Sequence, residues 1–129
     1  MKIHHSLLLI ILISLASMTS GQAGELQNST MKRIAEIALS TNHFPSDSDK
    51  AELKTIMNNK NMGDSLRIIA HALHNIQHSV NSTDKKALNK IENDPAAQPD
   101  IKQLAKILGN FNHNPSAEDA KTLKKIIDA

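Results

Sequence analysis

Residues 43–49 read HFPSDSD, and the same pattern returns as HSVNSTD at residues 78–84 and as HNPSAED at residues 113–119. Each copy begins with a histidine, ends with an aspartate and starts 35 residues after the previous copy. A fixed period of this length is the sequence signature of a tandem helical repeat. The period therefore decides the predicted fold.

The repeat extends on both sides of this stretch without a gap. Upstream, apolar residues recur with the spacing of one helix face, as at Met31, Ile34, Ala35 and Ala38. Five aligned positions carry the same residue in all three copies: Ala35, Ala70 and Ala105; His43, His78 and His113; Asp49, Asp84 and Asp119; Leu53, Leu88 and Leu123; Ile56, Ile91 and Ile126. We expect the Ala, Leu and Ile positions to form the core and the aspartates to cap helices.

Each repeat reads as two short helices joined by the turn that holds the histidine. We expect the first helix of each repeat to follow an N-cap residue, at Thr30, Ser65 and Asp100. The second helix is expected to begin at Ser46, at Asn81 or Ser82, and at Ser116, each with an aspartate in capping-box position. The predicted fold is all-α: three tandem αα-hairpin repeats, about 30–64, 65–99 and 100–129, with six short helices in a small array or a compact bundle.

The N-terminal residues have the pattern of a secretory signal peptide. Lys2 precedes the apolar run 7–13, and small and polar residues follow. We expect residues 1–23 to be removed after Ala23, leaving a helical-repeat domain of residues 24–129 that is secreted or periplasmic. The apolar run is shorter than the roughly 20 residues that span a bilayer, so no stable membrane anchor is expected after cleavage.

Composition argues against several classes of function. The chain has no Cys, Trp or Tyr, and its net charge is only +2 with both signs interspersed. This balance and the near absence of aromatic residues argue against a nucleic-acid partner. We find no nucleophile, acid–base or phosphate-binding motif, so no enzymatic activity is predicted.

The recurring histidines His43, His78 and His113 admit two interpretations. Each follows the end of a predicted helix, where its side chain could satisfy exposed carbonyl groups. Alternatively, the three could bind one metal ion. In an open array, equivalent positions lie at least a helix spacing of roughly 8–10 Å apart. A shared site would therefore require a closed bundle.

A second group of histidines lies within the middle repeat. His71, His74 and His78 have i, i+3 and i+7 spacing and would share one solvent-facing side of a continuous helix. Such a face could bind Zn(II), Cu(II) or Ni(II) and is our predicted metal site. The spacing is a weak motif for metal, and a polar surface face is the simpler interpretation. No other cofactor is expected.

The sequence therefore favours a secreted or periplasmic, non-catalytic module that binds an unidentified protein or has a structural role. The alternative is a small metal-binding or metal-buffering protein that uses His71, His74 and His78. Metal binding would weaken in acid as the histidines become protonated, whereas partner binding would not require metal.

Overall fold

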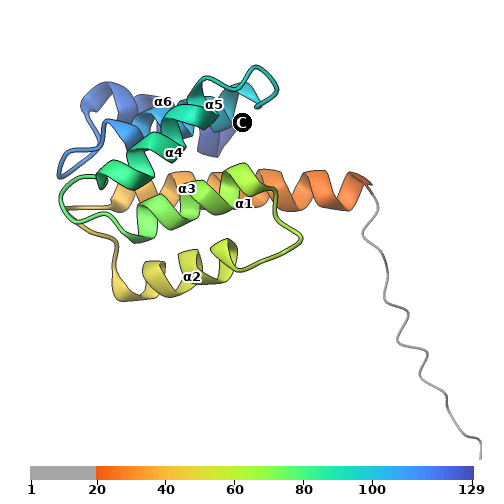
Figure 1. Cartoon of the computed structure of the whole chain (residues 1–129), viewed down its shortest axis with the longest axis horizontal. Helices are drawn as coiled ribbons and strands as arrows, with labels where there is room; N and C mark the ends of the chain where they lie inside the picture. The colour runs from red at the N-terminus through yellow and green to blue at the C-terminus, as the bar shows by residue number, and fades with distance from the viewer. Residues whose placement is uncertain (1–19) are drawn as a thin grey trace, which may run out of the picture.

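The computed structural model describes residues 20–129, which form six α-helices (Figure 1). Their bounds are α1 Ser20–Ser40, α2 Asp47–Met57, α3 Asp64–His74, α4 Ser82–Glu92, α5 Pro99–Gly109 and α6 Ala117–Asp128. Strands are absent from this part of the chain, apart from isolated bridges in the turns. The predicted all-α class and the six helices are confirmed.

The helix positions are compatible with three repeats. The starts of α2, α4 and α6 are spaced by 35 residues, as are the starts of α3 and α5. The expected caps of α2, α4 and α6 are present: Ser46, Asn81 and Ser116 accept hydrogen bonds from the backbone N–H groups of Asp49, Asp84 and Asp119 at 3.1, 2.8 and 3.0 Å. These bonds satisfy N–H groups that the first turn of a helix leaves unpaired.

The starts of the other three helices differ from the prediction. Helix α3 begins after Gly63 and α5 after Gln98, and neither residue caps its helix through its side chain. Pro99 explains the start of α5, because proline has no N–H to leave unpaired and its φ suits the first helical position. Helix α1 runs back to Ser20 rather than starting after Thr30, and residues 21–29 contain no proline that would break it.

Most of the predicted signal peptide, residues 1–23, lies outside the described residues. The expected cleavage point after Ala23 falls within α1. No helix of residues 20–129 has the length and hydropathy needed to cross a membrane.

The six helices form a closed arrangement. Helices α1, α3 and α5 contact one another at the centre, while α2 packs on α3, α4 on α5 and α6 on α1. The contact between α6 and α1 joins the last helix to the first, and Lys32 Nζ also donates a hydrogen bond to the backbone oxygen of Ala129. The structure is therefore a closed bundle rather than an open array.

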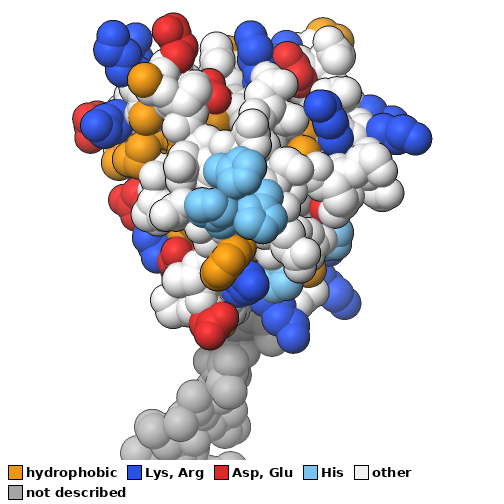
Figure 2. Space-filling model, turned by 90° about the vertical axis from the view of Figure 1, so that its left-hand side faces the viewer, with side chains coloured by type: hydrophobic (Ala, Val, Ile, Leu, Met, Phe, Trp, Pro, Cys, Tyr) orange, Lys and Arg blue, Asp and Glu red, His pale blue; other side chains and the backbone are white. Residues whose placement is uncertain are grey.

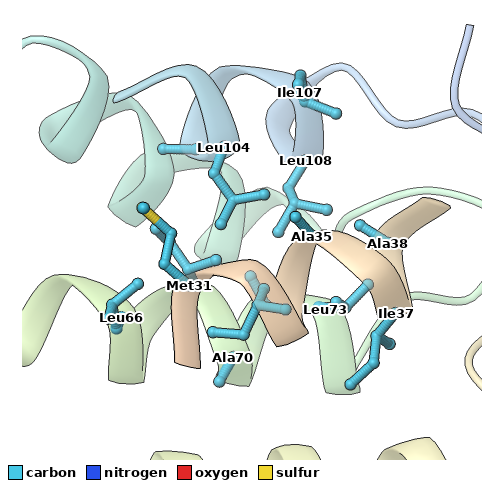
Figure 3. Packing of buried hydrophobic residues seen from close by; sticks show 14 of the residues in the cluster. Met31, Ala35, Ile37, Ala38, Leu66, Ala70, Leu73, Leu104, Ile107 and Leu108 are labelled. Atoms are coloured by element: carbon cyan, nitrogen blue, oxygen red, sulfur yellow. The ribbon is translucent and has the colours of Figure 1, made fainter. Parts of the chain in front are cut away.

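The core contains the apolar positions that the repeats predict, and in addition the buried Ile37, Ala72 and Ile107. Figure 3 shows Met31, Ala35, Leu66, Leu104 and Leu108 from the three central helices pointing toward one another. The Leu position shared by the outer helices is fully buried in all three copies, at Leu53, Leu88 and Leu123. Each buried Leu or Ile contributes roughly 1.5–3 kcal/mol by leaving water. This packing holds the turns after α1, α3 and α5 at one end of the bundle (Figure 1).

Candidate metal centre

Each of the three recurring histidines lies at the centre of a tight turn. The φ angles of His43, His78 and His113 are 68°, 67° and 64°, and they are the non-glycine residues with positive φ among residues 20–129. In each turn the N–H of the following residue donates to the C=O of the preceding residue, at 2.8, 2.8 and 2.7 Å. A positive φ with this bond defines the rarer and more strained form of γ-turn.

The three turns are joined by a closed ring of backbone hydrogen bonds. The N–H of His43 donates to the C=O of His113, that of His78 to His43, and that of His113 to His78, each at 2.6 Å. Every histidine therefore donates once and accepts once within the ring. Since buried and partly buried backbone groups need such partners, the ring fixes the separation of the three residues.

The side chains of these residues converge as well. The ring centroids of His43, His78 and His113 lie 4.9–5.1 Å apart. One nitrogen from each ring lies within 4.8 Å of those of the other two. His78 and His113 are exposed and His43 is half-buried. Figure 2 shows histidine side chains gathered at the centre of the face formed by this end of the molecule. We call these three residues the histidine cluster.

Neighbouring asparagines set the tautomer of two of the rings. His43 Nδ1 donates to Oδ1 of Asn42 and His113 Nδ1 to Oδ1 of Asn112, both at 2.6 Å. An amide oxygen can only accept, so Nδ1 is the donor, and in a neutral imidazole of this tautomer Nε2 has the free lone pair. A hydrogen bond at the other ring nitrogen is the usual way in which proteins orient a metal-binding histidine.

The metal site predicted from His71, His74 and His78 is divided by the structure. Helix α3 ends at His74, so His78 lies in the turn and not on the same helix face. His71 Nδ1 lies 3.1 Å from Oδ1 of Asp84, and His74 Nδ1 lies 3.1 Å from Oδ1 of Asn75. Within residues 20–129, the histidine cluster is the group of three whose ligand atoms lie close enough for one ion. Metal binding by His71 and His74 stays a prediction.

The contact between His71 and Asp84 belongs to a separate polar network. Asp84 is buried and also accepts hydrogen bonds from Asn81 Nδ2 at 2.6 Å and Asn75 Nδ2 at 3.4 Å. Asp84 thus links the end of α3 to the start of α4 in addition to its place in the predicted cap. His71 also borders an open hollow of about 440 Å³ between these helices, which is lined mainly by apolar surface.

The first repeat has an ion-pair network at the corresponding place. Arg33 on α1 binds Glu52 on α2 through Nε and Nη2, both at 2.8 Å, and also contacts Asp49 and Glu36. The hydrogen bond from Arg33 lowers the pKa of Glu52, and the carboxylates raise the pKa of Arg33. Glu52 is 40% exposed, so water screens the pair and its contribution to stability is small.

No protein-family model, curated protein or solved structure matches this chain. Its function is therefore argued from the geometry of its own residues. The recurrence of histidine at one repeat position was the sequence signal for the cluster. The sequence period gave no signal for the positive φ angles, or for the hydrogen bonds that Asn42 and Asn112 accept from the histidines.

Proposed function

We propose that this chain binds one transition-metal ion, such as Zn(II), through the imidazoles of His43, His78 and His113. The observation that carries the proposal is the convergence of these three rings from positions 35 residues apart. Three histidines with an open fourth position are a common ligand set for zinc, and imidazole also suits Cu(II) and Ni(II). This function is a form of the metal-binding alternative, with His78 retained and His43 and His113 in place of His71 and His74.

The backbone conformation supports a role for the imidazoles themselves. A positive φ is strained for a residue with a Cβ, by roughly 1–3 kcal/mol, and glycine would relieve most of that strain. All three turns nevertheless carry histidine. Strained residues of this kind are concentrated at ligand-binding and catalytic sites, where the surrounding structure holds them in place.

The distances between the rings also suit an ion. Nitrogens at about 2.1 Å from a tetrahedral zinc lie roughly 3.4 Å from one another. The cluster holds its nitrogens within 4.8 Å of one another, so the rings must move closer by up to about 1.4 Å to reach this spacing, and two of the three, His78 and His113, are exposed. The hydrogen bonds of His43 and His113 are made at Nδ1, so Nε2 is the nitrogen of each ring left to bind a metal.

The test is a calorimetric titration with Zn(II), Cu(II) and Ni(II) at about pH 7.5, where imidazoles are mostly neutral. Two double variants divide the histidines into matched pairs: His43→Asn/His113→Asn in the cluster, and His71→Ala/His74→Ala on α3. Asparagine tolerates positive φ, so the first variant keeps the turns. Circular dichroism of both variants verifies that they fold.

We expect binding of one ion, at micromolar or tighter affinity, that weakens at least about 100-fold in the cluster variant. The α3 variant should bind within about twofold of the unchanged protein. Binding that survives in the cluster variant, or that disappears in the α3 variant, would contradict the proposal. The second result would restore the site predicted from His71, His74 and His78.

The other sequence predictions remain predictions. These are export from the cytoplasm, an unidentified protein partner and the lack of enzymatic activity. An exported metal-binding protein is consistent with the absence of cysteine, because imidazole ligands are not lost to disulfide formation.

A further inference from the structure

The surface beside the histidine cluster is hollowed next to His78. A hollow of about 300 Å³ lies against His78 and is lined by Phe44, Lys50, Gln77 and His78. Its volume is at the small end of the range for ligand pockets. Figure 2 shows hydrophobic and basic side chains bordering the histidines on this face.

The lining combines an exposed aromatic ring with a positive charge. Phe44 is 56% exposed, although the chain has only two aromatic residues and buries the other, Phe111. Lys50 Nζ lies 5.5 Å from the centre of the Phe44 ring. The ammonium group is thereby held beside the hollow by a cation–π contact.

This combination occurs in the first repeat alone. The positions equivalent to Phe44 are Ser79 and Asn114, and those equivalent to Lys50 are Lys85 and Ala120. The three turns are therefore not equivalent, because the first alone places an aromatic and a cationic side chain, Phe44 and Lys50, beside the cluster. We call this part of the surface the flank. A repeat position that departs from its counterparts beside a shared site is where ligand selectivity would arise.

We propose that this flank binds a small carboxylate with an aromatic or other apolar group, whose carboxylate occupies the open position of the bound metal ion. The inference rests on the proposed metal function. A carboxylate is a good ligand for a His₃ zinc ion, and Lys50 adds a second positive charge on the side of the hollow. The apolar group of the ligand lies against Phe44, which removes exposed aromatic surface from water.

The probe is 4-fluorobenzoate, followed by ¹⁹F NMR during titration into protein loaded with one equivalent of Zn(II). The same titration is made with the zinc-free protein, with uncharged 4-fluorobenzyl alcohol and with inorganic phosphate in competition. Phe44→Ser and Lys50→Ala introduce residues that another repeat already has at these positions. Lys85→Ala is the matched control, because Lys85 is an exposed lysine at the same repeat position and outside the hollow.

We expect saturable binding of 4-fluorobenzoate to the zinc-loaded protein, at least tenfold weaker without zinc. Phe44→Ser and Lys50→Ala should each weaken the binding of 4-fluorobenzoate about fivefold or more, while their affinity for zinc stays the same. Lys85→Ala should bind 4-fluorobenzoate as the unchanged protein does. Zinc binding without fluorobenzoate binding would overturn this inference and leave the metal function standing. Equal binding of the alcohol, stronger binding of phosphate, or equal effects of Lys50→Ala and Lys85→Ala would also overturn it. Absence of zinc binding would overturn both proposals.

Discussion

The two groups of histidines differ in how sequence distance relates to spatial distance. His71 and His74 are neighbours on one turn of α3, yet their rings contact nearby polar side chains, His71 those of Asp84 and Asn75 and His74 that of Asn75. His43, His78 and His113 are separated by 35 residues each and their rings meet. In a closed repeat bundle, one residue contributed by each repeat can form a site around the common centre. Residues close together in one helix need not form one.

The largest expected effect concerns the central packing that holds the three turns at one end of the bundle. Leu108 on α5 is fully buried, two residues before the capping Asn110. Leu108→Ala should lower the free energy of unfolding by roughly 3–5 kcal/mol, because it removes buried surface and leaves a cavity. Urea denaturation measures the loss. Ile68→Ala on the neighbouring α3 is the control, since Ile68 is 37% exposed, and its loss should be below about 1 kcal/mol. Similar losses for both variants would contradict the packing described here.

Zinc should stabilise the protein through the cluster and not through α3. At a free zinc concentration about 100 times the Kd, the free energy of unfolding should rise by about 2.7 kcal/mol, because the ion binds the folded state. Urea denaturation with and without zinc measures this increase. His71→Ala/His74→Ala should keep the increase and His43→Asn/His113→Asn should lose it. The reverse pattern would assign the metal to α3.

The network around His71 should have a structural role that its counterpart in the third repeat lacks. Asp84→Ala leaves the amides of Asn75 and Asn81 without their acceptor and should cost about 1–3 kcal/mol of stability. Asp119→Ala, at the same repeat position, should cost less than about 1 kcal/mol, because it removes mainly a favourable charge at a helix N-terminus. Chemical denaturation of the two variants compares them. Equal losses would mean that the His71 network adds nothing to the cap.

The smallest effect concerns the ion pair that the first repeat has in place of this network. The folded-state pKa of Glu52 is lowered by Arg33, so the pair stabilises the protein above the unfolded pKa of glutamate and the stabilisation is lost as the pH falls. Glu52→Gln should cost about 0.2–1 kcal/mol near neutral pH, since the pair is exposed to solvent. The difference from the unchanged protein should shrink in acid, and thermal unfolding between about pH 7 and 3 measures it. A stability difference between Glu52→Gln and the unchanged protein that grows in acid would contradict the lowering of the Glu52 pKa by Arg33.

The sequence was sufficient for the number of helices and for most of the core, but not for the starts of α1, α3 and α5 or for the closure of the bundle. The shared Leu53, Leu88 and Leu123 predicted buried faces correctly, because helical spacing fixes which side of a helix is apolar. Whether stacked repeats close depends on a small rotation between them, which depends on packing details that a period does not encode. The contact of α6 with α1 was therefore beyond the sequence pattern.

The candidate site was predicted only in part for the same reason. Recurrence identified His43, His78 and His113 as special, but their convergence required the closed bundle. The group His71, His74 and His78 assumed a helix that continued past His74, whereas α3 ends there with Asn75 as its C-cap. A γ-turn centred on histidine is strained and therefore rare, so turn propensities gave no signal for it.

The most direct test of the metal centre is NMR of the imidazole nitrogens during titration with Zn(II), using protein labelled with ¹⁵N at histidine. The account predicts that His43, His78 and His113 shift together to the metal-bound form at one equivalent of zinc. Nδ1 of His43 and of His113 should keep its proton, because it donates to asparagine. The resonances of His71 and His74 should stay in place. Zinc-dependent shifts confined to His71 and His74, or no shift of any histidine, would contradict the assignment of the metal site to the cluster.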